Sequence, residues 1–141
     1  MSGTPYAEVI GDPIAQSKSP LIHKFWLDAL GISGDYRRAH IKADALAAFI
    51  DQRRTDSDWR GCNVTIPHKE AALAVSLPDN RARAVGAANT LYFDKDELRS
   101  TNTDVEGFIN NLDASTPGWD AAEDVLVLGA GGSARAVIFG L

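Results

Sequence analysis

Close to its C-terminal end, the chain passes from an apolar run directly into a cluster of glycines. Residues 124–128 (DVLVL) are typical of a buried strand, and residues 129–135 follow with the spacing G-x-G-x-x-A. Residues 134–139 favour a helix. A strand, a tight glycine turn and a helix in this order are typical of a Rossmann unit, in which backbone N–H groups at the helix start face a pyrophosphate. The candidate cofactor-binding residues are Gly129, Gly131, Gly132, Ser133 and Ala134.

The rest of the chain alternates predicted strands with predicted helices. Strands are expected at residues 6–10, 35–41, 62–66, 86–93 and 98–101, with a polar hairpin turn at 94–97. Helices are expected at residues 20–30, 44–54, from Pro67 to about 75, 81–85, and after Asp104. The helix at 44–54 should bury Leu46, Phe49 and Ile50. This alternation indicates an α/β layer fold with a largely parallel sheet.

The first predicted helix has a clear start and a broad apolar stripe. Ser19 is a good N-cap and Pro20 suits the first helical position. Apolar residues then recur at every fourth position, and we expect the stripe, including Phe25 and Trp26, to be part of the core. The stripe consists of Leu21, Ile22, Phe25, Trp26, Ala29 and Leu30.

Bulk properties exclude several classes of protein. At 141 residues the chain is one domain, or one domain and part of another. Its net charge is −5 and no basic run exceeds two residues, so neither nucleic acid nor an anionic membrane is an expected partner. No apolar run approaches the roughly 18 residues of a membrane span, and no signal peptide is recognisable. Cys62 is the only cysteine, which fits a reducing compartment. We expect a cytoplasmic protein. The sequence leaves the oligomeric state open, and a homodimer is one of the possibilities.

The strand predicted at residues 62–66 has one polar face. Asn63 and Thr65 alternate with Val64 and Ile66, and alternate residues of a strand share a face. Lys69 follows in the predicted first turn of the next helix, where a cation is disfavoured by the helix dipole. An amide, a hydroxyl and an ammonium at the end of one strand predict a site for a polar small molecule. His23, His40 and His68 show no metal-ligand spacing, so no metal is expected.

The dinucleotide unit predicted from the glycines is incomplete within these 141 residues. A βαβ unit takes about 30 residues, and the residue that reads the ribose lies about 20 residues beyond the glycines. We therefore expect this chain to be the front part of a longer protein, and the choice between NAD and NADP stays open. Packing against the first domain, or a partner chain, should order the end of the chain.

Five segments together resemble the shikimate dehydrogenase family. They are VIGDPIAQSKSP at 9–20, GCNVTIPHK at 61–69, GAANT at 86–90, NTD at 102–104, and the glycine turn at 129–135. Each segment alone is a modest signal, but their order and spacing match over the whole chain. The departures from the family pattern are Asp12, Gln16, Ala88 and Val105, and none of them removes a reacting group.

This resemblance implies a fold, an activity and a set of roles. It implies an N-terminal α/β substrate domain (1–102), followed by a connecting helix, a linker and the start of an NADP-binding Rossmann domain (103–141). It implies the reversible reduction of 3-dehydroshikimate to shikimate. By matching motif positions, it places Ser17 and Ser19 on the substrate carboxylate and Asn63, Thr65, Asn89 and Asp104 on its hydroxyls. It makes Lys69 and Asp104 the catalytic pair.

The chemistry implied needs only a proton carrier beside a bound nicotinamide. A lysine next to a carboxylate can carry the proton of an alcohol oxidation without a metal, if burial or a helix N-terminus favours loss of the lysine proton. Simpler interpretations exist for single residues: Lys69 as a solvated helix lysine, Ser19 and Asp104 as helix caps. For the whole chain the alternatives are a non-catalytic shikimate-binding fragment, because the nucleotide site is incomplete, or a relative that uses quinate.

Overall fold

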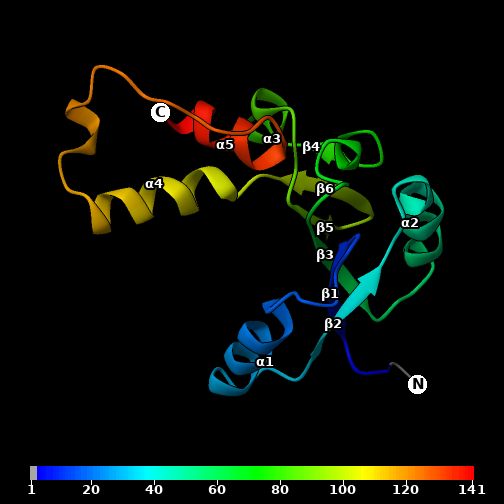
Figure 1. The fold of residues 1–141 in the computed structure, drawn as a ribbon. Coiled ribbons are helices and arrows are strands. Elements are labelled where there is room, and N and C mark those ends of the chain that lie inside the picture. The colour runs from blue at the N-terminus through cyan, green and yellow to red at the C-terminus, as the bar shows by residue number, and fades with distance from the viewer. Residues whose placement is uncertain (1–2) are drawn as a thin grey trace.

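The computed structural model describes residues 3–141, which form one six-stranded sheet with helices around it (Figure 1). The strands are β1 (Tyr6–Gly11), β2 (Asp35–His40), β3 (Trp59–Val64), β4 (Leu77–Pro78), β5 (Thr90–Asp94) and β6 (Glu97–Thr101). The helices are α1 (Ser19–Ala29), α2 (Leu46–Arg54), α3 (Asn80–Val85), α4 (Asp104–Ser115) and α5 (Gly132–Gly140). Short 3-10 turns occupy η1 (Ala43–Ala45), η2 (Ala71–Leu73) and η3 (Trp119–Ala121). The short strand β4 was not expected from the sequence.

The sheet is mixed but mostly parallel, as predicted. Its strand order is β2-β1-β3-β5-β6-β4. β1 pairs in parallel with β2 and β3, and β4 pairs in parallel with β6, whereas β5 is antiparallel to both of its neighbours. The carboxyl ends of β1, β3 and β6 therefore meet the beginning of β5 at one edge of the sheet. Segments that leave these strand ends lie close together there.

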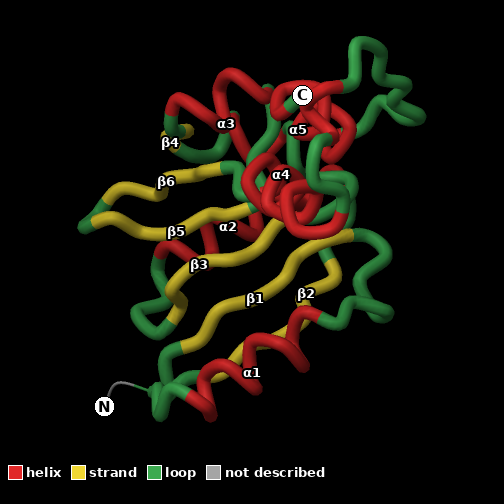
Figure 2. Tube along the Cα trace, turned by 90° about the vertical axis from the view of Figure 1, so that its left-hand side faces the viewer, coloured by secondary structure: helices red, strands yellow, loops and turns green. Residues whose placement is uncertain are grey.

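The main core lies between the sheet and α2, on the face opposite α1 (Figure 2). Leu46, Phe49 and Ile50 of α2 are all buried, as the sequence predicted. Trp59 of β3 is fully buried, with its ring edge-on to Phe49 at 6.5 Å. Burying one such side chain stabilises the fold by about 1.5–3 kcal/mol. This face of the sheet therefore supplies most of the hydrophobic stabilisation.

The apolar stripe of α1 is exposed, so the prediction that it belongs to the core is wrong. Phe25 and Trp26 are 67% and 52% exposed, and Pro20 is the only buried residue of the helix. Among the described residues, nothing covers this face, and an apolar groove of about 510 Å³ separates α1 from β1, β3 and β5. The N-cap is Lys18 rather than Ser19, which is itself the first helical residue.

No α-helix follows Pro67, contrary to prediction. The strand β3 ends at Val64, and the following segment forms only the 3-10 turn η2. The Lys69 carbonyl accepts from the backbone N–H of Ala88 at 2.7 Å, and the N–H four residues on, that of Leu73, bonds to the Glu70 carbonyl at 3.3 Å in a 3-10 pattern. Lys69 therefore lies in a turn, and the helix N-terminus expected beside it does not form.

The strand expected at residues 86–93 begins later, at Thr90. Gly86 ends α3 in the left-handed conformation, with φ of 71°. The loop between them is shaped by the same hydrogen bond from Ala88 to the Lys69 carbonyl. The hairpin turn and the return strand agree with prediction, because β5 pairs with β6 from Thr90–Thr101 to Asp94–Glu97.

The apolar run at 124–128 is not a buried strand, contrary to prediction. It is extended, and Leu126 and Leu128 are 83% and 89% exposed. A strand needs a neighbour to satisfy its backbone, and within residues 3–141 no strand pairs with it. The helix α5 forms as expected and packs on α3 and α4, with Ala136 buried against Val85 and Val105 (Figure 1). None of the described helices has the length and apolarity to cross a membrane.

Candidate active site

Lys69 and Asp104 form an ion pair at the edge where the strand ends meet. Lys69 lies in the turn after β3, and Asp104 is the first residue of α4, which begins just beyond the end of β6. The lysine Nζ donates to Oδ2 of Asp104 at 2.6 Å. The side chains are 14% and 29% exposed, so the pair is shielded but open to a ligand from one side. An ammonium held by a carboxylate in this way is positioned to exchange a proton with a bound hydroxyl.

Asn89 holds the carboxylate of this pair from the other side. Its Nδ2 donates to Oδ1 of Asp104 at 2.8 Å and to the hydroxyl of Thr103 at 2.8 Å. Its Oδ1 accepts from the backbone N–H of Thr103 at 3.0 Å and from the hydroxyl of Thr90 at 2.9 Å. All four hydrogen-bonding positions of the amide are thus engaged. A ligand that bonds to Asn89 must therefore replace one of these contacts.

Asn102 fixes the start of α4 from within the core. It is fully buried. Its Nδ2 donates to the carbonyl of Ala87 at 2.9 Å, and its Oδ1 accepts from the backbone N–H of Asp104 at 3.0 Å. One side chain therefore sets the position of Asp104 relative to the loop before β5. The sequence shows Asn102 only as part of a resembling segment and does not reveal this role.

Asn63 joins the same network through Thr90. Its Nδ2 donates to the Thr90 hydroxyl at 3.3 Å, and its Oδ1 accepts from the hydroxyl of Tyr36 at 2.5 Å. Tyr36 is buried, and burial raises the pKa of its phenol above the ordinary value, so the hydroxyl keeps its proton. Neither Tyr36 nor Thr90 was identified from sequence. Thr90 lies in the resembling segment 86–90, whereas Tyr36 lies in a predicted strand whose sequence, DYRRAH, does not single it out.

Ser17 and Ser19 contact each other but not the residues above. Their hydroxyls are 3.2 Å apart, and Ser17 Oγ accepts from the backbone N–H of Ser19 at 3.3 Å. The guanidinium of Arg38 on β2 holds the Ser17 carbonyl at 2.6 Å. Thr65 lies just past the end of β3, where its backbone N–H donates to the carbonyl of Ile10 at 3.0 Å.

The glycine turn lies directly across from Lys69. A cavity of about 640 Å³ is lined by Thr65, Pro67, Lys69 and residues 127–134. Lys69 Nζ donates to the hydroxyl of Ser133 at 3.1 Å. Gly132 approaches the lysine stem so closely that a Cβ there would lie 3.0 Å from Cβ of Lys69. The predicted cofactor turn and the predicted catalytic lysine are therefore neighbours.

The backbone of the glycine turn is open to an anion. Gly129 has φ of 139°, a conformation that L side chains rarely adopt, and a Cβ at Gly131 would meet only open space. The start of α5 carries no capping side chain, so its N–H groups remain available to a phosphate. An ion pair between Arg135 and Glu70 at 3.1 Å ties the helix to the lysine loop. The residues predicted to bind the cofactor, Gly129, Gly131, Gly132, Ser133 and Ala134, therefore leave room and free N–H groups for a phosphate.

Cys62 and His68, two further residues of chemically active types, are both buried. The thiol of Cys62 is buried, and burial, with a further contribution from Glu8, raises its pKa above the ordinary range. His68 is buried with its ring bonded to the Ile41 carbonyl at 2.7 Å, a structural role. Among residues 3–141, no His, Cys, Asp and Glu side chains group as metal ligands would.

Known proteins resemble this chain in sequence and structure. A family model described as the shikimate dehydrogenase substrate binding domain matches residues 9–91. The NADP(+) shikimate dehydrogenase of Afipia carboxidovorans is 64% identical over 141 residues, which are 100% of this chain and 50% of that protein. The chain spans about half the length of the curated relatives it matches.

Solved structures agree in fold. Shikimate 5-dehydrogenase from Thermus thermophilus, in complex with NADP(H) and shikimate, has a TM-score of 0.86 and 39% identity over 96% of this chain and 51% of that one. Shikimate dehydrogenase from Aquifex aeolicus has a TM-score of 0.89 and 32% identity over 97% of this chain and 51% of that one. On its sequence match and its fold, the chain belongs to the shikimate dehydrogenase family and carries the family's substrate-binding domain.

Proposed function

We propose that the chain is the substrate-binding part of an NADP-dependent shikimate dehydrogenase, which interconverts 3-dehydroshikimate and shikimate. Residues 1–102 would bind the substrate, and residues 103–141 would connect to the dinucleotide domain and begin it. The observation that carries the proposal is the Lys69–Asp104 pair at 2.6 Å, facing the glycine turn. The proposal is supported by the names of the relatives and by the shikimate and NADP(H) complex among the similar structures.

The proposed mechanism uses Lys69 as the proton carrier. Bound nicotinamide supplies the hydride acceptor or donor. Lys69 Nζ has three donor positions, of which Asp104 and Ser133 occupy two. The third is available to the reacting oxygen, which loses its proton to the amine on oxidation and regains one from the ammonium on reduction. Asp104, itself held by Asn89, keeps the nitrogen in place.

The other side chains would bind and orient the ring. Asn63, Thr65 and Asn89 offer amide and hydroxyl groups to the substrate hydroxyls. Ser17 and Ser19, two adjacent hydroxyls beside the start of α1, would receive its carboxylate. Hydroxyl donors and a helix start both favour a carboxylate.

Two measurements on the chain test this proposal. Calorimetric titration with shikimate should show binding, and a nicotinamide-linked assay with NADP(+) should show whether these 141 residues also turn shikimate over. Binding without turnover would assign the chain a binding role only, and absence of binding would overturn the proposal. Quinate in the same titration distinguishes the related specificity.

Lys69→Ala tests the role of the lysine in a chain that has the complete dinucleotide domain. Loss of a positioned proton carrier should lower turnover by about 10²–10⁴-fold. Lys95→Ala is the matched control, because Lys95 lies in the β5–β6 turn at the opposite edge of the sheet. Equal turnover in the two variants would remove Lys69 from the mechanism.

A further inference from the structure

The hydrogen bonds around Asn63 and Asn89 form a single chain whose direction is fixed. It begins at the backbone N–H of Thr103, which can only donate, and which donates to Oδ1 of Asn89. This contact sets which way the Asn89 amide faces. The carboxylate of Asp104, which can only accept while ionised, takes the Nδ2 end of the same amide.

The direction then passes to Thr90 and Asn63. Oδ1 of Asn89 can only accept, so the Thr90 hydroxyl donates its hydrogen bond to this oxygen, at 2.9 Å. The Thr90 oxygen can then only accept, so it faces Nδ2 of Asn63, at 3.3 Å. The Asn63 amide is thereby turned so that its Oδ1 faces Tyr36, whose hydroxyl donates to it.

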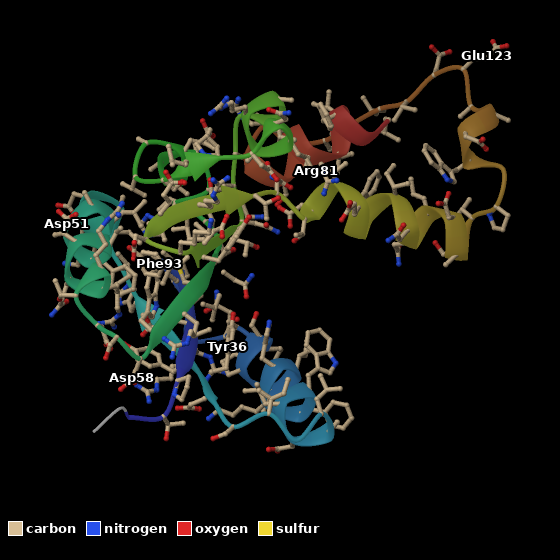
Figure 3. The ribbon with its side chains drawn as sticks, turned by 180° about the vertical axis from the view of Figure 1, so that it is seen from behind. Tyr36, Asp51, Asp58, Arg81, Phe93 and Glu123 are labelled. Atoms are coloured by element: carbon tan, nitrogen blue, oxygen red, sulfur yellow. The ribbon has the colours of Figure 1, made fainter. Side chains whose placement is uncertain are left out.

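Tyr36 closes this chain from a buried and rigid position. The residue is 4% exposed, and its ring stacks on His23 of α1 with centroids 3.9 Å apart and planes 10° apart. Figure 3 shows Tyr36 between the sheet and α1. A buried aromatic ring with a parallel neighbour has little freedom, so the hydroxyl stays aimed at Asn63.

We propose that Tyr36 is a positioning residue: its hydroxyl fixes the Asn63 amide so that the second Nδ2 hydrogen is presented to a hydroxyl or carbonyl oxygen of the substrate. Nδ2 of Asn63 carries two hydrogens. Thr90 accepts one of them, and among the described residues no acceptor takes the second. The inference rests on the proposed function, since it assumes that a polyhydroxylated ring acid of the shikimate type binds beside Asn63. The inference adds a determinant of substrate specificity, because an amide held in one orientation favours ligands with an oxygen at one position of the ring.

Substitutions that remove one hydroxyl each test the proposal on the 141-residue chain. Tyr36→Phe keeps the ring and its stacking, and Thr90→Val keeps the side-chain shape. Each should weaken shikimate binding about five- to tenfold, the effect of one net hydrogen bond. Thr90→Ser restores the hydroxyl and should bind like the parent chain. Tyr6→Phe is the matched control, because it removes a tyrosine hydroxyl bonded to Asp56, away from the site.

A second ligand separates positioning from a general structural effect. Cyclohexene carboxylate has the ring and the carboxylate without the hydroxyls, and its weak binding can be followed by NMR titration. Tyr36→Phe and Thr90→Val should leave its affinity unchanged, because no ligand oxygen faces Asn63. Equal weakening for both ligands would mean that the variants only disturb the fold, and the proposal would be overturned.

The remaining outcomes are also decisive. Folded Tyr36→Phe and Thr90→Val chains that bind shikimate as tightly as the parent would overturn the role of Tyr36 while leaving the proposed function intact. A parent chain that does not bind shikimate would overturn both. If Tyr36→Phe does not fold, the comparison of Thr90→Val with Thr90→Ser still decides, because both act on the same hydrogen-bond chain.

Discussion

Replacing Asn102 by alanine should destabilise the chain by about 2–4 kcal/mol. Asn102 is fully buried, and each end of its amide bonds to a backbone group, the Ala87 carbonyl and the Asp104 N–H. A buried backbone group left without its partner costs about 1–3 kcal/mol. Two such groups would cost about 2–6 kcal/mol in full, and water entering the small space left by the side chain reduces that sum.

Urea unfolding measured by tryptophan fluorescence suits this test, because Trp59 lies in the main core. In a thermal melt of a chain of this length, the expected loss of unfolding free energy lowers the melting temperature by roughly 4–16 °C. Asn110→Ala is the matched control, since Asn110 lies exposed on the same helix. It should change the unfolding free energy by less than about 0.5 kcal/mol.

A loss below about 1 kcal/mol for Asn102→Ala would refute this reasoning. It would mean that water or relaxation satisfies both backbone groups, and that Asn102 does not fix the start of α4. Asn102→Asp adds a finer test. The variant keeps an acceptor for Asp104 but loses the donor to Ala87, so a buried carboxylate would face a carbonyl. It should be no more stable than the alanine variant at neutral pH.

Two further predictions concern ionic groups away from the site. Hydrogen bonds from Arg37 and Lys24 lower the pKa of Asp35 from 3.8 to about 2, so the folded state binds fewer protons than the unfolded chain. The stabilisation from Asp35 is complete above about pH 4 and is lost as the pH falls towards 2. Asp35→Asn should therefore flatten the pH dependence of the urea midpoint between these values. An unchanged pH dependence in the variant would contradict this prediction. Arg53→Met should cost about 3 kcal/mol, because it leaves the buried carboxylate of Glu8 without its guanidinium partner at 2.9 Å. Adding Glu8→Met should restore part of that loss, and a double variant less stable than the single one would rule out the ion-pair explanation.

Features set by neighbouring residues could be predicted from the sequence. The spacing of Leu46, Phe49 and Ile50 identified the buried face of α2, because a helix repeats every 3.6 residues whatever it packs against. The polar residues at 94–97 identified the hairpin between β5 and β6. The resembling segments pointed to Lys69 and Asp104. In the structure Nζ of Lys69 lies 2.6 Å from Oδ2 of Asp104, and the catalytic roles of the two residues stay predictions.

Features set by distant residues could not be predicted. The stripe of α1 has the pattern of a buried helix, but burial depends on what covers it, and nothing in residues 3–141 does. Residues 124–128 have the composition of a strand but no neighbour to pair with. The directed chain from Tyr36 to Asp104 joins segments far apart in sequence, and no short pattern encodes it.

The helix dipole acts on the other partner of the ion pair than the sequence suggested. Sequence reasoning placed Lys69 in the first turn of a helix, where a cation is disfavoured. In the structure Lys69 lies in a turn, and Asp104 is the first residue of α4. The positive end of α4 then stabilises the carboxylate that holds the lysine. Because the backbone N–H of Asp104 is also bonded to Asn102, the anion is fixed before any ligand arrives. Residues before the glycine turn therefore orient the lysine. Among the described residues, Lys69 makes one hydrogen bond to the glycine turn, to the Ser133 hydroxyl at 3.1 Å.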